Sequence, residues 1–504
     1  MIKSFSPFGY EGAVITVETD LRRGIPATDI VGMADGAVKE TRERIQAAIK
    51  NSGFEYPPER VLIALSPSDL KKDGAGYDLS IALSILEANQ GKYSDIPVMV
   101  LGELELSGRV RNTKGIYSAL QTAVANGIKY AIIPANAEKE PDGILCHRVE
   151  SLKEAFYALQ NLEEDATDEA YNEMIYKQSS GSNKIEFVDY DFTENFDKLE
   201  NVDGLKYAMA VAVAGRHNLI TWGSPGCGKT MTLQHLPSIM PKLLPEERQS
   251  TKRIWSLAGL LKPSEEMETR PFRIPHQTAS IEGICGGGPN CRPGEISLAH
   301  NGILFLDEAA EFRCSVLQML RVPLENHNIT LCRAGRSTVY PANFQLFMTT
   351  NPCPCGNYGS HEKICLCSAK SVDLYWKKFS APLLDRMDIR YDCNNPIETV
   401  SLTLEETRSF IKTAWKRQYK RQKKLNYELS PQEIIDFVKL TPNAEYTLSR
   451  AGDRYGYSPR TISSIKKLAR TIADMYSETE TLEIDEDYIQ KAIQLHTSLP
   501  LWEN

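Results

Sequence analysis

One segment restricts the possible fold more than any other. Residues 223–230 fit the pattern GxxxxGK[ST] without a gap, as Gly223-Ser224-Pro225-Gly226-Cys227-Gly228-Lys229-Thr230. An apolar run precedes this segment and a helix-compatible run follows it, so a strand, a loop and a helix are predicted in that order. In such a loop, backbone N–H groups surround a phosphate, Lys229 adds a positive charge and Thr230 offers an oxygen ligand to Mg²⁺. The segment therefore predicts a nucleotide site.

A pair of carboxylates follows a second apolar segment. The run Ile303–Leu306 is wholly apolar, and Asp307 and Glu308 come directly after it. Such a run predicts a buried parallel strand that delivers both carboxylates at its C-terminal end. Asp307 is expected to hold Mg²⁺ through water, and Glu308 to polarise the attacking water. The adjacent pair favours hydrolysis over binding alone, with a strand that ends in an acidic turn as the alternative.

Three further polar residues are placed to complete such a site. Asn351 follows a third strand-like run and is expected to orient the lytic water, the alternative being a turn former before a proline. Arg386 is expected to reach the γ-phosphate bound by a neighbouring subunit. An ion pair with Asp385 or Asp388 is the alternative for that arginine. Arg460 opens a late helix and offers another phosphate contact, although a plain helix start explains it equally.

The order of these motifs resembles the AAA+ layout. The stretches 270–278, 286–289 and 292–302 closely resemble the magnesium-chelatase-like branch, and within it the ComM/YifB family of bacterial AAA+ proteins. The resemblance covers nearly the whole chain. It implies a homo-hexameric ring with ATP and Mg²⁺ between subunits, and ATP-driven helicase or branch-migration activity on single-stranded or branched DNA. It also implies recombination or DNA-uptake proteins as partners, with a protein-remodelling, chelatase-like motor as the alternative.

The resemblance also assigns roles to single residues. The Walker and first sensor positions of one subunit correspond to Lys229, Thr230, Asp307, Glu308 and Asn351. Arg386 corresponds to an arginine finger that acts on the neighbouring subunit, and Arg460 to the second sensor in the helical lid. Cys227 departs from the family pattern, because small residues such as serine are common there. Its side chain is expected to point away from the backbone cradle.

The N-terminal segment resembles the protease domain of Lon. Aligning the shared anchors puts Gly76 where Lon has its nucleophilic serine and Tyr117 where Lon has its lysine. A Ser–Lys dyad needs a hydroxyl and an amine, so this unit is predicted to be catalytically inactive. Ser80 and Lys114 lie nearby in the sequence but out of register. The unit is expected to help assemble the ring or to contact substrate.

The α/β chain is therefore predicted to contain four segments. They are a Lon-like α+β unit over 1–160, an acidic linker over 161–200, an AAA+ α/β core over 201–395 with a cysteine-rich insertion at 353–367, and a helical lid over 396–504. The net charge of −8 argues at first against nucleic acid. However, the linker carries twelve acidic residues and three lysines, or −9, so the other 464 residues sum to +1. Composition therefore does not oppose DNA binding.

Four cysteines gather within fifteen residues as a CxC…CxC pattern, at Cys353, Cys355, Cys365 and Cys367. Neither an export signal nor a run of about 20 apolar residues precedes them, so a cytoplasmic, reducing location without a membrane partner is expected. There, four thiolates favour a structural Zn²⁺ site. Packing cysteines without a ligand, and redox or iron–sulfur use, remain as alternatives. His361 is a spare ligand.

Two segments are candidates for DNA contact. Arg408–Lys424 contains eight Lys or Arg residues and no acid, with Trp415 and Tyr419 between them. Cations neutralise phosphates and aromatic rings stack on unpaired bases, but a solvated helix face docked at the lid is the alternative. Pro275–Gly288 matches the family's insertion beside the ATPase core. Its glycine-rich loop is the favoured substrate contact, on the strength of the resemblance.

Overall fold

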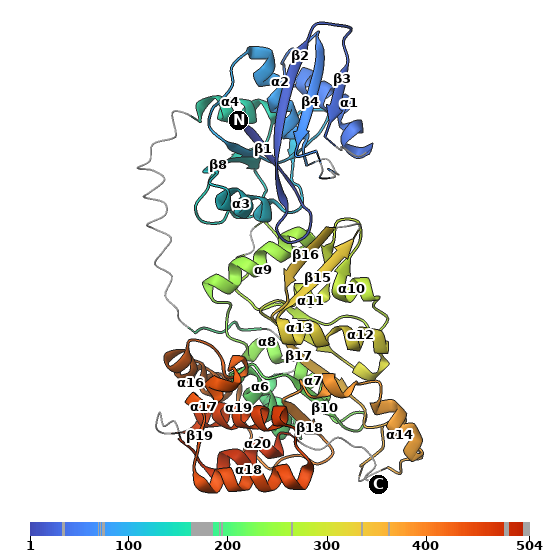
Figure 1. Cartoon of the computed structure of the whole chain (residues 1–504), viewed down its shortest axis with the longest axis vertical. Coiled ribbons are helices and arrows are strands. Elements are labelled where there is room, and N and C mark those ends of the chain that lie inside the picture. Colours follow the sequence, from blue (N-terminus) through green and yellow to red (C-terminus); the bar gives the residue numbers. More distant parts are fainter. Residues whose placement is uncertain are drawn as a thin grey trace.

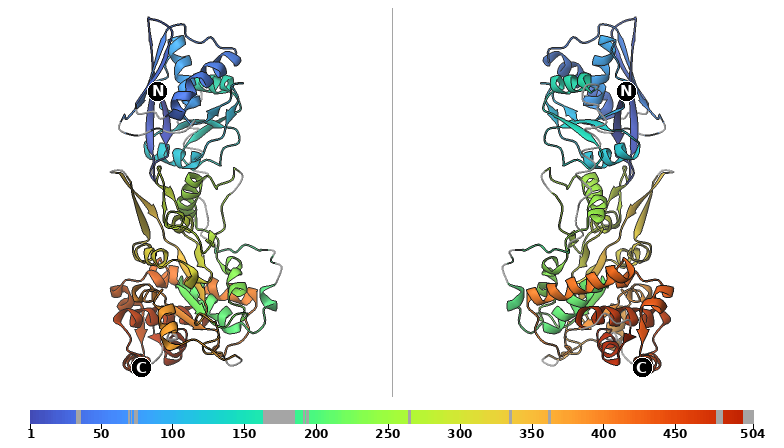
Figure 2. Two further views of the ribbon diagram at one scale, coloured as in Figure 1. Left: turned by 90° about the vertical axis from the view of Figure 1, so that its right-hand side faces the viewer. Right: turned by 90° about the vertical axis from the view of Figure 1, so that its left-hand side faces the viewer.

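The computed structural model describes residues 1–32, 36–68, 70, 72, 76–162, 185–190, 192, 195–263, 266–333, 336–360, 363–477 and 483–496. The chain forms an elongated molecule of three successive units (Figure 1). A unit built around a mixed sheet lies at one end, a unit built around a parallel sheet lies in the middle, and helices form the other end. Two side views show the same order along the long axis (Figure 2).

The first unit contains a seven-stranded sheet within its described residues, in the order β3-β4-β2-β1-β5-β8-β9. Its strands are β1 (Ile2–Ser6), β2 (Ala13–Arg22), β3 (Thr28–Val31), β4 (Arg60–Ser66), β5 (Val98–Val100), β8 (Tyr130–Pro134) and β9 (Leu145–Val149). The pairs β1–β2 and β2–β4 are antiparallel, whereas β1–β5, β5–β8 and β8–β9 are parallel. The sheet is therefore mixed, as an α+β unit requires.

Helices cover this sheet because each presents an apolar face to it. They are α1 (Gly36–Asn51), α2 (Asp78–Gln90), α3 (Ile116–Ala125) and α4 (Leu152–Asn161), and a small ribbon of β6 (Glu103–Leu104) and β7 (Val110–Arg111) lies beside α2. Helix α2 is buried along nearly its whole length. A helix that is apolar all round belongs inside a unit rather than on its surface.

The second unit is built on an all-parallel sheet with the strand order β11-β14-β17-β10-β18 in the described chain. These strands are β10 (Leu219–Trp222), β11 (Phe272–Arg273), β14 (Ile303–Leu306), β17 (Gln345–Thr350) and β18 (Ile389–Asp392). Every residue of β10, β14 and β17 is buried. Central parallel strands covered on both faces require such continuous apolar runs, which explains why they were recognisable in the sequence.

Helices and short ribbons surround the parallel sheet. They are η1 (Phe196–Lys198), α6 (Asp203–Gly215), α7 (Lys229–Gln234), α8 (Leu236–Ile239), α9 (Pro245–Ala258), α10 (Ile281–Cys285), α11 (Glu295–Leu298), η2 (Ala309–Glu311), α12 (Cys314–Met319), α13 (Arg321–Asn326), α14 (Ala369–Trp376) and α15 (Ala381–Leu384). The antiparallel ribbons pair β12 (Gly286–Gly287) with β13 (Arg292–Pro293), and β15 (Asn328–Arg333) with β16 (Arg336–Pro341).

The third unit is helical. It contains α16 (Leu404–Gln422), η3 (Asn426–Glu428), α17 (Pro431–Phe437), α18 (Pro442–Tyr455), α19 (Pro459–Tyr476) and α20 (Glu486–Gln494), with a ribbon of β19 (Lys439–Leu440) and β20 (Glu483–Ile484). Ser458 caps α19 by accepting a hydrogen bond from the backbone N–H of Thr461, and Pro459 occupies the first turn. Both residue types favour a helix start.

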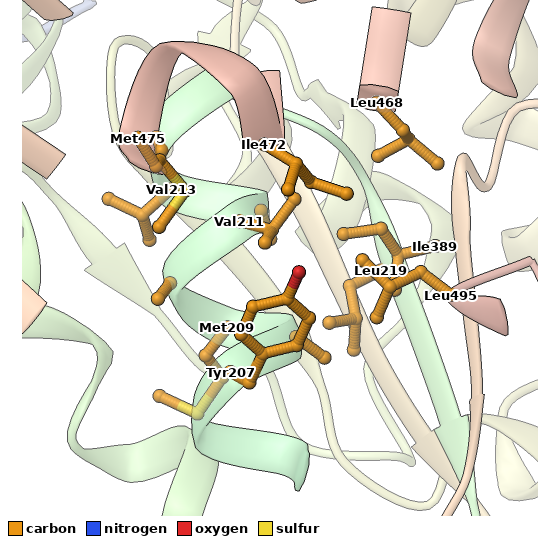
Figure 3. Packing of buried hydrophobic residues seen from close by; sticks show 14 of the residues in the cluster. Tyr207, Met209, Val211, Val213, Leu219, Ile389, Leu468, Ile472, Met475 and Leu495 are labelled. Atoms are coloured by element: carbon orange, nitrogen blue, oxygen red, sulfur yellow. The ribbon is translucent and has the colours of Figure 1, made fainter. Parts of the chain in front are cut away.

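The helical unit and the parallel sheet share one hydrophobic core. Helix α6 packs between them: Val211 lies beside Ile472 of α19 on the side of β10, and Val213 lies beside Met475 of α19 (Figure 3). Leu468 and Ile472 of α19 belong to the same buried cluster. The helical unit is thus attached to the parallel-sheet unit by continuous apolar packing.

The predicted linker has two parts in the structure. Residues 163–184, which hold most of its predicted solvated stretch, lie outside the described residues. The following residues pack onto the second unit: Phe187 forms a β-bridge with Pro241, and Phe196 is buried. Arg408 of α16 forms an ion pair with Asp189 at 2.6 Å.

The first two units are in direct contact through the loop between β1 and β2 (Figure 1). The Arg253 guanidinium of α9 donates to the backbone oxygens of Tyr10 and Glu11, both at 2.9 Å, and lies 4.7 Å from the Tyr10 ring centre. The Tyr10 backbone N–H donates to Thr338 Oγ1 of β16 at 3.0 Å. A cation over an aromatic ring adds to these hydrogen bonds.

The predicted fold class is confirmed: a mixed α/β N-terminal unit, a parallel α/β core and a helical C-terminal unit are all present. Within the described residues, no helix has the length and apolar character needed to cross a membrane.

A buried carboxylate at the centre of the helical unit gives a stability prediction. Asp474 is fully buried, accepts two hydrogen bonds from Arg421 at 2.8 Å, and accepts another from Arg470 at 2.8 Å. Asp474→Ala leaves the buried Arg470 guanidinium without its counter-charge, so the free energy of unfolding should fall by about 3–5 kcal/mol. Denaturant titration followed by circular dichroism measures this loss.

The matched control is Asp20→Ala, which removes the exposed partner of Arg22. That change should cost about 0–1 kcal/mol, because solvent screens exposed ion pairs. Equal losses for the two variants would contradict the structural role given to Asp474.

Candidate functional site

The phosphate loop joins β10 to α7. Gly226 and Gly228 have φ values of +87° and +83°, in the left-handed region that favours glycine. Apart from its chain neighbours, no atom lies within 4 Å of the position that a Cβ on Gly226 would take, so there is open space beside this residue of the loop. The Lys229 ammonium donates to the backbone oxygens of Gly223 at 2.7 Å and Ser224 at 3.0 Å. The loop therefore presents backbone and one positive charge around an open cradle, which fits a phosphate.

The two expected magnesium ligands are in contact. Thr230 Oγ1 donates to Asp307 Oδ1 at 2.7 Å, and Thr349 Oγ1 donates to the same carboxylate oxygen at 2.5 Å. Thr230 lies in the first turn of α7, whereas Asp307 follows β14, so two separate elements bring a hydroxyl and a carboxylate together. Hard oxygen donors of this kind suit Mg²⁺. The residues present therefore fit the ion that the motif implies.

Glu308 is exposed beside this pair and has a left-handed backbone, with φ of 51°. Its backbone N–H donates to Thr349 Oγ1 at 3.0 Å, and its carboxylate Oε2 accepts from Gln277 Nε2 at 2.6 Å. Left-handed backbone is unfavourable for a residue with a Cβ, and such strain gathers at functional positions. Gln277 belongs to the 275–288 insertion, which the sequence predicts to contact substrate, so that insertion contacts the Glu308 carboxylate directly.

Asn351 lies at the same edge of the sheet as the phosphate loop. Strands β10 and β17 are parallel neighbours, and Trp222 is paired with Thr350, so Gly223 and Asn351 follow paired residues. A Cβ on Gly356 would lie 2.7 Å from Pro225 Cδ and 3.9 Å from Asn351 Cγ. The cysteine-rich loop therefore packs tightly against both the phosphate loop and Asn351.

A cavity of about 480 Å³ lies beside the phosphate loop and is lined by Ser224–Gly228 on one side. Its walls combine apolar and polar groups from three segments, including Val202, Leu205, Cys227, Tyr391, Cys393 and Asn394. Asn394 Oδ1 accepts from the backbone N–H of Ser224 at 2.9 Å and from its Oγ at 3.0 Å. A cavity of this size beside the phosphate loop, lined by both apolar and polar groups, has room for the base and sugar of a nucleotide.

Arg386 lies at the opposite edge of the sheet. Its backbone oxygen accepts from Asn218 Nδ2 at 3.0 Å, and Asn218 precedes β10, whereas the phosphate loop follows that strand. A four-residue strand separates the two ends by about 13 Å. The guanidinium forms an ion pair with Glu325 rather than with Asp385 or Asp388, so those two predicted partners are wrong.

Arg460 is on the side of Arg386. The hydrogen bond and charge of Arg386 lower the pKa of Glu325, and the nearby charges of Arg460 and Arg321 lower it further. Arg460 is exposed. The structure thus gathers three arginines around one carboxylate, away from the chain's own phosphate loop.

The four clustered cysteines converge in space. Their sulfur atoms all lie within 4.8 Å of one another, and Cys353 Sγ is 3.3 Å from Cys355 Sγ and 3.7 Å from Cys365 Sγ. Sulfur atoms around a tetrahedral zinc ion lie about 3.8 Å apart, given Zn–S bonds of ~2.3 Å. The cluster, completed by Cys367, can therefore bind a metal ion. His361, the spare ligand of the prediction, lies outside the described residues.

The basic stretch is a docked helix rather than a stacking platform. Trp415 is buried and its indole Nε1 donates to Val213 O at 3.1 Å, and Tyr419 is partly buried beside it. The expectation that these rings stack on bases is wrong, because they face the core. Arg417 donates to backbone oxygens at the end of α19, whereas Lys412 and Lys416 are exposed.

The N-terminal unit offers no Ser–Lys pair at the positions that Gly76 and Tyr117 occupy. Ser80 is fully buried in α2 and donates to Tyr77 O at 2.8 Å, so its hydroxyl is engaged with its own helix. Lys114 extends toward Gly259 of the second unit. Tyr117 is buried, and burial raises its pKa well above the usual value.

Comparison with known families agrees with this arrangement. The chain matches models described as "Magnesium chelatase, subunit ChlI" over 196–400, "Subunit ChlI of Mg-chelatase" over 17–137 and "Magnesium chelatase, subunit ChlI C-terminal" over 402–496. The "Uncharacterized protein YifB" of Escherichia coli strain K12 is 34% identical, over 94% of this chain and 93% of the relative. The chain belongs to the ComM/YifB family of magnesium-chelatase-like AAA+ proteins.

Other relatives extend this assignment. The "Competence protein ComM" of Haemophilus influenzae is 31% identical over 96% of this chain and 95% of the relative. The "Lon protease" of Brevibacillus choshinensis is 25% identical over 34% of this chain and 22% of the protease. The likeness to Lon is therefore partial, whereas the likeness to the ComM/YifB family spans the chain.

Three residues of this ComM/YifB-type site were not predicted from the sequence. Thr349 orients Asp307 and the backbone of Glu308, Gln277 holds the Glu308 carboxylate, and Asn394 holds Ser224. Thr349 had a usable signal, because it lies two residues before Asn351 at the end of the same buried strand. The other two approach from distant parts of the chain.

Proposed function

We propose that the chain is the subunit of a hexameric ring motor that hydrolyses ATP and uses the energy to unwind DNA or move its branch points. The observation that carries this proposal is the position of Arg386. One copy has its phosphate loop at one edge of the parallel sheet and Arg386 at the opposite edge. A second copy is needed to bring the arginine to the phosphates, and a closed ring lets every copy supply both.

In the proposed reaction, the chain's own groups bind and orient the substrate. The backbone of residues 223–228 and the Lys229 ammonium bind the phosphates, and the cavity beside Val202 and Tyr391 holds the base. Thr230 and Asp307 would hold Mg²⁺, which would neutralise part of the phosphate charge when bound. Glu308 polarises the attacking water, and Asn351 fixes the direction of attack. Arg386 from the neighbouring copy stabilises the charge that develops on the transferred phosphoryl group.

Two features support DNA as the partner. Lys412 and Lys416 are exposed on α16, and Lys423 is exposed at the C-cap of the same helix. Such cations neutralise backbone phosphates. The Gln277–Glu308 hydrogen bond at 2.6 Å connects the 275–288 insertion to the catalytic carboxylate. A DNA strand bound by the insertion would therefore change the rate of ATP turnover. One relative is named a competence protein, which supports a role in DNA uptake or recombination with partner proteins of those processes.

A cytoplasmic location follows from the same proposal, because ATP is supplied there and the clustered thiols stay reduced. The second candidate is a motor that remodels a protein partner. The magnesium-chelatase models that match the chain favour it. The first experiment below separates the two candidates.

Forked and single-stranded DNA should each stimulate ATP turnover, measured by phosphate release. Glu308→Gln should retain ATP binding and lose turnover by ~10²–10⁴-fold, because the activating carboxylate is gone. Native mass spectrometry with a non-hydrolysable ATP analogue should show six copies.

The DNA contact is tested by changing Lys412, Lys416 and Lys423 together to glutamate, which should remove the stimulation. The control makes the same charge change at the exposed lysines Lys50, Lys92 and Lys153 of the first unit. Turnover that ignores DNA but rises with a protein partner would replace the DNA motor with the protein-remodelling motor.

The action of Arg386 across subunits predicts complementation. Lys229→Ala lacks the phosphate-binding charge and Arg386→Ala lacks the arginine, so each alone should lose turnover, by ~10³–10⁵-fold for the arginine. Mixing the two variants should restore part of the activity, because the first supplies an intact arginine to the intact phosphate loop of the second. The trans assignment is contradicted if the mixture is no more active than the sum of the two variants measured separately. It is also contradicted if the mixture is only as active as a control mixture in which one component carries both substitutions.

We also propose that Cys353, Cys355, Cys365 and Cys367 hold a structural zinc ion. The sulfur spacing suits a tetrahedral thiolate site. The Tyr358 backbone N–H donates to Cys353 Sγ at 3.3 Å, and hydrogen bonds of this kind fix the orientation of a ligand. Because Gly356 packs against Pro225, the ion would also brace the phosphate loop.

Metal analysis of the purified protein should find roughly one zinc ion per chain. Cys355→Ser and Cys367→Ser should each lose the zinc and lower the melting temperature, because the loop loses its cross-link. Cys314→Ser is the control, since Cys314 is exposed on α12, outside the cluster. A stably folded sample that contains no metal would overturn the zinc site.

A further inference from the structure

Two cysteines from distant parts of the chain flank Gly223 at the start of the phosphate loop. A Cβ on Gly223 would lie 2.7 Å from Cys393 Cβ and 2.9 Å from Cys227 Sγ. Cys227 belongs to the phosphate loop, and Cys393 directly follows β18. Both side chains therefore pack against the same glycine. The parallel pairing of β10 with β18 brings them together, because Trp222 is paired with Asp392.

The surroundings of the pair favour reaction at Cys227. The neighbouring Cys393 side chain and the charge of Lys229 lower the pKa of Cys227 to about 6. Lys229 Nζ lies 3.6 Å from the Cys227 sulfur. A thiolate rather than a thiol is the nucleophile in cysteine oxidation. Cys393 is held in place, since its backbone N–H donates to Trp222 O at 2.8 Å and its sulfur lies 3.1 Å from Thr221 Oγ1.

We propose that Cys227 and Cys393 are a redox-sensitive pair that peroxide converts to a disulfide across the phosphate loop. The Cys227 thiolate attacks one oxygen of hydrogen peroxide, which breaks the O–O bond and leaves a sulfenic acid and hydroxide. The Cys393 thiol then attacks the sulfenic sulfur, and the S–S bond forms as water leaves. The two thiols lose two electrons in total, and the peroxide is reduced to water.

The disulfide would hinder nucleotide binding for a geometric reason. Both cysteines line the cavity of about 480 Å³ beside the phosphate loop. The next residue, Asn394, already holds Ser224 through its backbone N–H and hydroxyl. A covalent link at Cys227 would fasten the second half of the loop to the same strand end. The loop could then no longer adjust around the phosphates.

The pair extends the proposed function, because the expected consequence rests on ATP binding to this loop. The test uses the full-length protein, reduced and then treated with hydrogen peroxide. Mass spectrometry of peptides digested without reductant should find Cys227 joined to Cys393. A fluorescent ATP analogue should bind roughly tenfold more weakly or worse after treatment, and dithiothreitol should restore its affinity. Mg·ATP present during treatment should slow formation of the disulfide.

Two variants sharpen the test. Cys393→Ser removes the second thiol, so peroxide should form no cross-link, and ATP affinity should change less than in the unaltered protein, each compared with its own reduced form. Cys314→Ser is the control, since Cys314 is exposed on α12, and it should respond to peroxide like the unaltered protein.

Each outcome is decisive. Absence of the Cys227–Cys393 peptide would overturn the pair, and a peptide that forms without any loss of ATP affinity would overturn its effect on the site. A reduced protein that binds no ATP would instead refute the proposed function, while the mapped peptide would still report on the two thiols.

Discussion

The parallel pairing of β17 with β10 on one side and β14 on the other is the constraint on which the candidate site depends. Parallel strands bring their carboxyl ends to one edge of the sheet, so the phosphate loop, Asp307 and Asn351 meet there although they are far apart in sequence. The same pairing leaves the amino ends at the opposite edge, where Arg386 is bound by Asn218. The same sheet therefore brings the phosphate loop, Asp307 and Asn351 together and keeps Arg386 at the other end of its strands.

The attachment of the lid follows from residues next to that sheet. His217 precedes β10, and its Nε2 lies 2.8 Å from Thr471 Oγ1 of α19. Asp388, two residues beyond Arg386, accepts from Ser464 of the same helix at 2.6 Å. These buried hydrogen bonds fasten α19 to the segment that carries Arg386. Polar groups buried in this way are costly to break, which favours movement of the lid and the arginine together.

The sequence predicted those parts of the fold and the site that local patterns encode. A glycine-rich loop after an apolar run, and two carboxylates after another, are local signals, so residues 223–230, Asp307 and Glu308 were recognisable. Gln277 and Asn394 were not, because their roles depend on contacts across the folded chain. The burial of Trp415 and Tyr419 on α16 could have been predicted from the sequence. Together with Ile411 they repeat at every fourth position, which is typical of a helix face turned to a core.

The ion pair between Arg386 and Glu325 affects a newly made copy of the chain before it meets other copies. A newly folded copy already has a complete phosphate loop, yet its arginine is neutralised and points to the far edge of its own sheet. Under the proposed assembly, a lone copy would hold nucleotide without consuming it. ATP would be hydrolysed only where neighbouring copies meet, so assembly itself would switch on ATP consumption.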